Sequence, residues 1–455
     1  MDFLDNIVLP QSAHHMELLR GLLSITLIIL IPYLSVLTGS LIFSILYLKK
    51  KKTSNNNYNY RFAKELIDLS TFNKSVAFGF GVIPFISAIF AYAQLLDKTS
   101  SYLPYYVSVA FVFFLIALLF IYTYKYAFHL KDIFNFVSTE KIQSEADEST
   151  EEEFEKYSSA ANRIFKKFAG WGLLFLLIAD YKLISSIQLS LNPGLWEPNP
   201  GFWSVLFSIP ALVNFFNFLI VSLALTSIIV LYVYFRPNSI YKRNNDEYLS
   251  FVKQFALKSS LLFSLFIPVV IVLNILVLPT VALTNAVFLI SLIAIILVLI
   301  TGNYLYIMMK EGHLKYVPAA TYVFILVIAL IIFKNEYAFE SATKKHFVVL
   351  ATNYEEYSQK LKAELGGKEK TVSGEEIYKT RCMACHRFET KLVGPPHLKV
   401  LPKYEGKEDK LIKFILNPVK VDPAYPSMPN QGLKPNEAKA VADYMLKVYE
   451  EKKKK

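Results

Sequence analysis

Long apolar runs recur eight times in the first 334 of the 455 residues. Each run has about 20 residues or more, which is the length that an α-helix needs to cross the hydrocarbon core of a bilayer. The segments between the runs hold most of the charged residues. The pattern predicts eight membrane-spanning helices, over residues 20–48, 73–95, 104–128, 166–190, 204–235, 258–280, 283–309 and 316–334.

Basic residues are distributed unevenly between the segments that connect these helices. Segments 49–72, 129–167, 236–258 and 310–315 carry 6, 6, 5 and 2 Lys or Arg residues, whereas the alternate segments contain Lys98 alone. Cytoplasmic loops of membrane proteins are enriched in Lys and Arg. We therefore expect a multi-pass protein of the bacterial inner membrane with both termini in the periplasm.

The membrane part also shows signs of an internal duplication. A Lys-Ser pair, a proline and a His-Leu-Lys triplet each recur after 184 residues, for example Pro84 as Pro268 and His129 as His313. The matches predict a tandem repeat of two four-helix units, and an even number of helices inserts both units the same way. Chance matching between apolar segments is the other explanation.

The chain divides into three parts on this pattern. Residues 1–334 predict a transmembrane domain of eight helices. Residues 335–372 predict a linker with a helix over 347–365, which ends before two glycines. Residues 373–455 predict a small all-α periplasmic domain. The expected fold is therefore all-α throughout.

Composition supports a membrane protein and changes the interpretation of the net charge. Hydrophobic residues make up 54% of the chain, and the mean hydropathy is +0.37, too apolar for a soluble protein of this size. The net charge of +11 follows the membrane topology, so we expect no nucleic-acid partner. The acidic N-terminus does not resemble a cleaved signal peptide, so we expect the first run to remain as a membrane helix.

The only two cysteines lie in the run Cys382-Met383-Ala384-Cys385-His386. A C-x-x-C-H run is the attachment signature of a c-type haem, in which both thiols bond to the porphyrin and the adjacent imidazole binds the iron. A zinc site would need more thiolates or paired histidines, and a redox C-x-x-C would need a βαβ frame. Neither is visible, so we expect one covalent haem c.

Met428 is the candidate for the second axial ligand, a role that Met or His fills in such centres. It lies 42 residues after His386, within Tyr425-Pro426-Ser427-Met428-Pro429. The flanking prolines stiffen an extended loop and fix the direction of the thioether. Met383 adjoins the cysteines and Met445 falls inside a helix pattern, so both are expected to be packing residues.

With these motifs, residues 373–451 resemble a class I cytochrome c domain. Ser373-Gly374-Glu375-Glu376 is typical of a capping box at the start of the helix that leads to the haem motif. The segment Gly394-Pro395-Pro396 resembles the Gly-Pro turn of that family, which implies that a carbonyl at Pro395 orients the imidazole of His386.

The same resemblance implies the remaining helices. Residues 411–416 predict a short middle helix that stops at Pro418, and Pro435 opens a C-terminal helix that crosses the first one in this family. His397 follows the Gly-Pro turn directly. We expect it at the surface, because Met428 already fills the ligand position.

Four histidines of the membrane part are candidates for haem or quinone contacts. His14 and His15 fall at the periplasmic mouth of the first helix, and His129 and His313 end the third and seventh helices on the cytoplasmic side. A haem b in the bundle would need axial ligands inside it, and none of the four is in the middle of a run. Helix-end residues are the other interpretation.

Asp180 and Lys182 fall inside the fourth run. Charges within a bilayer cost several kcal/mol unless they are paired or hydrated, so they often mark a path for protons or substrate. Because both lie toward the periplasmic end of the helix, side chains that reach out to the membrane surface are the alternative.

The membrane architecture resembles subunit I of cytochrome bd-type quinol oxidases, with two four-helix units and a periplasmic N-terminus. Residues 72–81 are the nearest local similarity. The Gly-Arg-Gln-Pro-Trp signature and the ninth helix of that family are missing from the sequence. The eight-helix subunit of polysulfide-reductase-like complexes has a similar organisation. Both resemblances concern architecture alone and imply a quinone-handling fold.

Two functions are consistent with these features. The first is electron transfer by a membrane-anchored monohaem cytochrome c, as a subunit of a quinol-linked respiratory complex. Residues 371–455 contain 17 Lys or Arg and 11 Asp or Glu residues, which favours an acidic soluble periplasmic carrier as a partner. The alternative is a quinol oxidase or quinol:cytochrome c reductase that binds haem b and quinone in the bundle. A transporter with an attached redox sensor is a third class.

Overall fold

A computed structural model of the protein describes residues 10–49, 58–99, 101–139, 148–196, 207–243, 245–365 and 373–453. The described residues are almost entirely helical and form no strand, so the predicted all-α class is confirmed. The chain divides into two compact units, residues 1–355 and 356–455.

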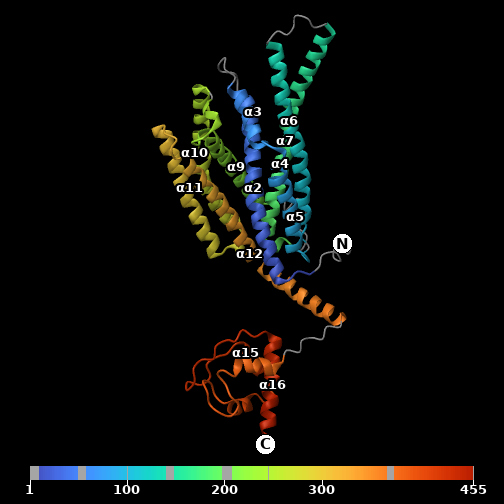
Figure 1. The fold of residues 1–455 in the computed structure, drawn as a ribbon, viewed down its shortest axis with the longest axis vertical. Helices are drawn as coiled ribbons and strands as arrows, with labels where there is room; N and C mark the ends of the chain where they lie inside the picture. The colour runs from blue at the N-terminus through green and yellow to red at the C-terminus, as the bar shows by residue number, and fades with distance from the viewer. Residues whose placement is uncertain are drawn as a thin grey trace. The chain divides into compact units, whose positions relative to one another are not determined.

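Among the described residues, eight helices are long and apolar enough to cross a membrane, and they form the bundle shown in Figure 1. They are α2 (Ala13–Lys49), α4 (Lys74–Ala77) continuing through η1 (Phe78–Val82) into α5 (Ile83–Leu95), α6 (Leu103–Thr139), α7 (Glu148–Ser190), α9 (Ile209–Phe235), α10 (Asp246–Val277), α11 (Asn285–Glu311) and α12 (Val317–Glu364). Each of the eight predicted spans overlaps one of them.

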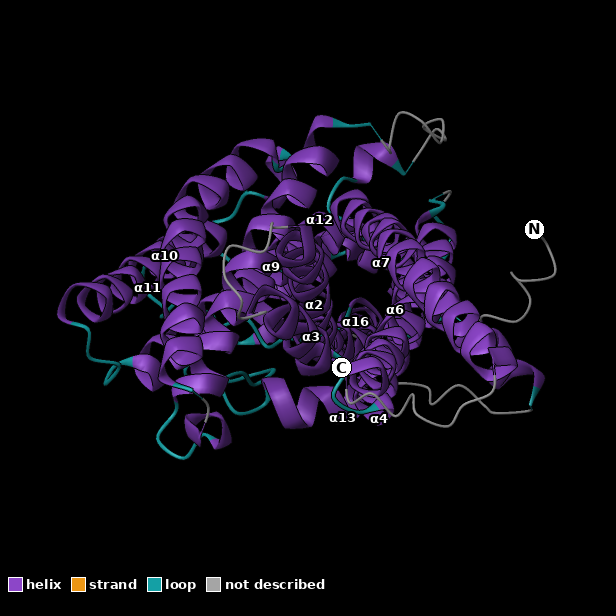
Figure 2. Cartoon of the chain, turned by 90° about the horizontal axis from the view of Figure 1, so that it is seen from above, coloured by secondary structure: helices purple, strands orange, loops and turns teal. Residues whose placement is uncertain are grey.

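Helix α2 lies at the centre of the bundle, between the α6–α7 pair and the α10–α11 pair (Figure 2). It packs against α5, α7 and α9, and α6 and α7 lie side by side over much of their length. Helices α2 and α9, which begin the two predicted four-helix units, therefore pack against each other. The tandem repeat itself remains a prediction.

The outer faces of the bundle are apolar. Leu119, Ile209 and Leu276 are each more than two thirds exposed. Many other large apolar side chains on these helices are about half exposed. Water-soluble monomers rarely expose large contiguous apolar patches. A lipid environment removes that cost, so the exposed faces agree with a membrane protein.

Several helices begin at a capping side chain. Ser208 accepts a hydrogen bond from the backbone of Ala211 at the start of α9 (3.3 Å). Asn245 caps α10 in the same way through the backbone N–H of Glu247 (2.9 Å). Such caps satisfy the first N–H groups of a helix. Helix α10 therefore begins at Asp246, well before the predicted residue 258.

Helix α12 runs for 48 residues without a break. The predicted last membrane helix ended at residue 334, and a separate helix was expected over 347–365. The sequence contains no Gly or Pro between Pro318 and Gly366, and Ala338, Phe339 and Leu350 stay buried on one face. The helix therefore continues through most of the segment expected to be a linker.

The basic segment 49–72 contains a further helix, α3 (Tyr58–Ser70). Its apolar face, which includes Phe62 and Leu66, is fully buried. On the same helix, the Glu65 carboxylate accepts hydrogen bonds from the hydroxyls of Tyr234 and Tyr248. These contacts attach α3 to α9 and α10 at one end of the bundle (Figure 1).

The second unit contains short helices around a small core. Its elements are α13 (Gly374–Ile377), η5 (Tyr378–Cys382), α14 (His397–Val400), η6 (Leu401–Tyr404), α15 (Glu408–Leu416) and α16 (Pro435–Lys453). A Cβ at Gly374 would lie 2.0 Å from the carbonyl oxygen of Ala440. Glycine therefore lets the first and last helices cross in direct contact, as the sequence resemblance implies. Gly366-Gly367 and residues 197–206 lie outside the described residues.

Candidate functional site

The C-x-x-C-H run forms a tight turn at the end of η5. The backbone N–H groups of Cys385 and His386 both donate to the carbonyl oxygen of Cys382, at 3.1 and 3.0 Å. Both cysteines are free and half-buried. The turn places the two thiols and the following imidazole at one cavity.

The His386 ring is held by the Gly394-Pro395 segment. Its Nδ1 lies 3.2 Å from the carbonyl oxygen of Pro395, which accepts its hydrogen. The backbone N–H of Gly394 donates to the carbonyl of Cys385 at 2.8 Å. A Cβ at Gly394 would lie 2.2 Å from Cε1 of His386. A glycine is therefore required where this loop passes the imidazole, whose Nε2 remains available for another partner.

Met428 lines the same cavity as His386. The loop that carries it is extended between Pro426 and Pro429, and the Met428 side chain is half-buried. Of the other two methionines of this unit, Met445 is buried as predicted. Met383 is 49% exposed, so its prediction as a packing residue was wrong.

His397 is a correction to the sequence analysis. It was expected at the surface, yet it is 5% exposed. Its ring stacks on His386 with 4.8 Å between the ring centroids and 16° between the planes. Burial, and then the nearby His386, lower the pKa of His397 to about 3, so the ring stays neutral. The cause is the helical turn α14, which directs His397 inward against Tyr378 and Phe388.

The residues of this cavity fit a haem group. The cavity has a volume of about 300 Å³, which lies in the range of small-molecule and cofactor sites. Two thiols line it, together with the imidazoles of His386 and His397 and the thioethers of Met428 and Met445. His397 and Met445 are buried in packing contacts, which leaves one imidazole and one thioether as the ligand set that a c-type centre requires. Its other walls are largely apolar and include Val400, Leu401, Phe414, Ile415 and Leu433.

The described residues around the two thiols do not complete a metal-thiolate site, which needs further thiolates or paired histidines. Burial, and then the neighbouring Cys385, raises the pKa of the Cys382 thiol. Within the described ranges, no group of three His, Cys, Asp or Glu side chains could hold a metal ion.

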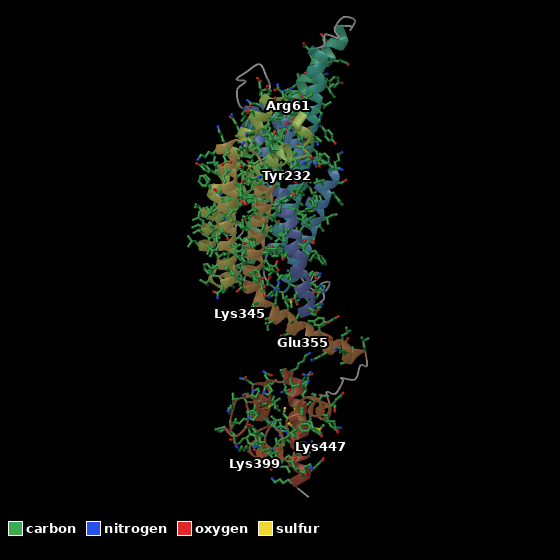
Figure 3. The ribbon with its side chains drawn as sticks, turned by 60° about the vertical axis from the view of Figure 1, so that its left-hand side comes forward. Arg61, Tyr232, Lys345, Glu355, Lys399 and Lys447 are labelled. Carbon is green, nitrogen blue, oxygen red and sulfur yellow. The ribbon has the colours of Figure 1, made fainter. Side chains whose placement is uncertain are left out.

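The rim of the cavity is basic. The charged residues that line it are four basic ones, Arg381, Lys399, Lys403 and Lys420, and one acidic one, Asp422. Lys399 is exposed and is labelled on this unit in Figure 3. An approaching anionic surface would therefore meet positive charge at the cavity mouth.

His14 and His15 lie in the first turn of α2, and His313 follows the end of α11. Helix α6 continues to Thr139, so the prediction that His129 ends the third helix was wrong. None of the four lines the cavity around His386 or the cavity of the membrane unit. His14 and His15 are exposed, and His15 Nε2 lies 3.4 Å from Oε1 of Gln94. His129 is half-exposed, with Nε2 3.5 Å from Oδ1 of Asp68. His313 is exposed directly after the C-terminus of α11.

Asp180 and Lys182 are both buried, at 0% and 8% exposure. The Thr38 hydroxyl donates to Oδ2 of Asp180 at 2.6 Å, and the ammonium of Lys182 lies 5.0 Å from the ring centroid of Tyr106. Neither side chain reaches out to the surface, and neither lines the cavity of the membrane unit.

That membrane cavity is formed by polar residues that the sequence analysis did not select. Gln188, Asn214, Asn274 and Lys334 come from four different helices and meet there. Lys334 is the last residue of the eighth predicted apolar run. Only packing of the four helices brings them together, and the one signal in the sequence was polar residues inside apolar runs.

Comparisons with known proteins identify the second unit. The sequence profile of the family described as Cytochrome c matches residues 371–448. Cytochrome c-551 of Pseudomonas denitrificans is 34% identical over 79 residues, which make up 16% of this chain and 95% of that protein. Cytochrome c-551 of Azotobacter vinelandii is 36% identical over 78 residues, with the same coverage. Cytochrome c-552 of Nitrosomonas europaea is 36% identical over 73 residues, or 15% of this chain and 70% of that protein.

Proposed function

Through residues 371–448 the chain belongs to the cytochrome c family, and from this premise we propose that it is a membrane-anchored monohaem electron carrier of a respiratory complex. The family implies a covalently bound haem c and haem-based electron transfer. The eight apolar helices of the described residues support anchoring in a membrane. The observation that carries the proposal is the common cavity of the two thiols, His386 and Met428.

Each of these residues has a specific role in the proposal. Cys382 and Cys385 would hold the porphyrin through thioether bonds, and the half-buried turn around them would fix its position. His386 and Met428 would bind the iron, and the Pro395 carbonyl fixes the tautomer and direction of the His386 ring. A bound haem would supply one-electron redox chemistry. The apolar walls would limit the access of water to it.

The proposed topology places both termini in the periplasm of a bacterial inner membrane. An even number of spans puts both ends on the same side, and the basic segments favour the cytoplasm for the opposite side. Arg61 and Lys345 lie toward opposite ends of the membrane unit (Figure 3). Because haem c is attached outside the bacterial cytoplasm, the cytochrome unit belongs on the periplasmic side in this proposal.

The proposed partners are other subunits of a quinol-linked complex and an acidic periplasmic carrier. The excess of Lys and Arg over Asp and Glu in residues 371–455 and the basic rim of the cavity support an anionic docking surface. Complementary charge speeds association and makes it sensitive to salt.

A pyridine haemochrome spectrum of the purified full chain tests the proposal. We expect the bands of a single haem c and no haem b. Additional b-type bands would favour the alternative function, a quinol oxidase or quinol:cytochrome c reductase whose bundle binds haem b. A spectrum without any haem would contradict both.

A further inference from the structure

A cavity of about 110 Å³ lies inside the membrane unit, between α2, α7, α9, α10 and α12. Most of its lining consists of Ile, Leu and Val side chains. Its polar lining is limited to Gln188, Asn214, Asn217, Asn274, Lys334 and Asn335. An apolar chamber with a few convergent polar groups is the usual composition of a small-molecule site.

The polar side chains form a chain of hydrogen bonds with one direction. Lys334 can only donate, and its ammonium donates to Oδ1 of Asn274. The amide nitrogen of Asn274 is thereby left to donate to Oδ1 of Asn214. Asn214 in turn donates to Oε1 of Gln188 at 2.7 Å. The lysine therefore fixes the orientation of three amides from three other helices.

Lys334 is a buried cation among neutral partners. It is 3% exposed, and none of the ion pairs between described residues involves it. A lysine inside an apolar bundle is costly unless its donors are satisfied, and such residues tend to mark functional sites. Of its three donors, one is used by Asn274. The others are suited to an oxygen acceptor in the cavity.

Two acceptors complement this donor. The amide nitrogen of Asn217 donates to the carbonyl of Val270 at 3.1 Å, so its Oδ1 faces away from that bond. Oδ1 of Asn217 and Oδ1 of Asn335 are buried without a hydrogen-bond partner in the described part of the chain. Unsatisfied buried acceptors are costly. A ligand that supplies hydroxyl hydrogens would satisfy them.

We propose that this cavity binds the ring of a lipid-soluble quinone or its quinol, with the ring oxygens at Lys334, Asn217 and Asn335. The inference rests on the proposed function, since it supplies the binding site of the quinol-linked electron donor. A quinone oxygen accepts from Lys334, and a quinol hydroxyl donates to the asparagine oxygens. The volume of about 110 Å³ is below the roughly 150 Å³ that holds one benzene ring, so a bound ring requires outward movement of the apolar side chains that line the cavity.

The chemistry of the site excludes two other ligand classes. An inorganic anion could accept from Lys334 but has no hydrogens for the oxygens of Asn217 and Asn335. A metal cation would be repelled by the ammonium of Lys334. Water could satisfy both kinds of group, but it would gain nothing from the isoleucine walls contributed by Ile184, Ile187 and Ile271.

Binding is tested with the full chain in nanodiscs of synthetic lipid without quinone. Decylubiquinone and 2,3-dimethyl-1,4-naphthoquinone are titrated separately, because they represent the two common ring classes. An azido-quinone is photo-crosslinked in parallel, and the labelled peptides are identified by mass spectrometry. We expect saturable binding of at least one quinone and crosslinks on α9, α10 or α12.

Two variants and one control assign the binding to the cavity. Asn274→Leu removes the central amide with little change of volume, and Lys334→Met removes the charge but keeps the length of the side chain. Each is expected to weaken binding about tenfold, as the loss of a good hydrogen bond would. Asn303→Leu is the control, because Asn303 is exposed on α11 and does not line the cavity.

The outcomes separate this inference from the proposed function. Binding that weakens in both variants but not in the control supports it, provided that the variants keep the thermal melting midpoint of the natural chain. Equal binding by all four proteins would indicate that the quinone partitions into lipid, and this result would overturn the inference. The absence of crosslinks in the natural chain would also overturn it, because the cavity would then hold water only. The haem c spectrum of the same sample is read independently, and its loss would instead overturn the proposed function.

Discussion

The Nδ1 atom of His386 lies 3.2 Å from the carbonyl oxygen of Pro395. A ring nitrogen engaged in this way leaves the opposite nitrogen as the lone-pair donor, so one hydrogen bond selects both the tautomer and the direction of the potential iron ligand. The intervening Gly394 makes this approach possible, because a Cβ would lie 2.2 Å from the imidazole.

Gly394→Ala is therefore expected to displace the His386 ring. The added methyl group cannot be accommodated without movement of backbone or imidazole, and we expect covalent haem to be retained while the ligand field changes. Absorption and magnetic circular dichroism spectra of the oxidised protein measure the change. Gly170→Ala is the control, because nothing lies within 4 Å of a Cβ at Gly170. An unchanged spectrum of the Gly394 variant would show that the turn does not orient the ligand.

His397 gives a prediction about stability. Its two ring nitrogens are buried without a hydrogen-bond partner among the described residues. His397→Phe keeps a ring against His386 and removes the unsatisfied atoms, so we expect the free energy of unfolding to rise by about 1 kcal/mol. His397→Ala removes the packing and should lower it by about 2 kcal/mol or more. Guanidinium unfolding of the full chain, followed by haem absorbance, measures both.

A loss of stability in the Phe variant would mean that the imidazole nitrogens have a partner in the mature protein. That result would contradict the neutral packing role that burial gives to His397.

The basic rim of the haem cavity is expected to guide a redox partner. Lys399 is exposed and lines the cavity, whereas Lys447 is exposed on α16 and does not. Lys399→Glu should slow electron exchange with an acidic carrier several-fold at low ionic strength, and the difference should fade at high salt because of screening. Stopped-flow kinetics measures the rates. If Lys447→Glu slows the exchange equally, net charge and not the rim decides the encounter.

The proposed topology predicts the activity of reporter fusions. Alkaline phosphatase, which is active outside the cytoplasm, should be active after residues 196 and 365 and inactive after residues 139 and 243. The basis is the excess of Lys and Arg in segments 49–72, 129–167, 236–258 and 310–315. Activity after residue 139 together with inactivity after residue 365 would reverse the topology and exclude a periplasmic cytochrome unit.

The sequence predicts most of the fold because its signals are local. Eight apolar runs correspond to eight helices, and the Cys382–His386 run, the Gly394-Pro395 turn and Met428 all meet at one cavity. Each of these signals is contained in a few neighbouring residues, so it needs no knowledge of the packing.

The features that the sequence does not reveal depend on contacts between distant residues. His397 follows a turn that is typical of a surface loop, and only its stacking on His386 explains its burial. The cavity around Lys334 requires Gln188, Asn214 and Asn274, which lie on separate helices. The continuity of α12 was missed for a different reason, since a fall in hydropathy was interpreted as the end of a helix although no helix-breaking residue follows until Gly366.

The central claim is that an iron porphyrin is covalently bound to Cys382 and Cys385. Proteolysis of the purified chain and mass spectrometry of the peptide that contains both residues tests it most directly, with Cys382→Ser/Cys385→Ser as the control. We predict that the peptide carries one haem through two thioether bonds and that the control carries none. Two free thiols on the natural peptide, open to alkylation, would contradict the claim.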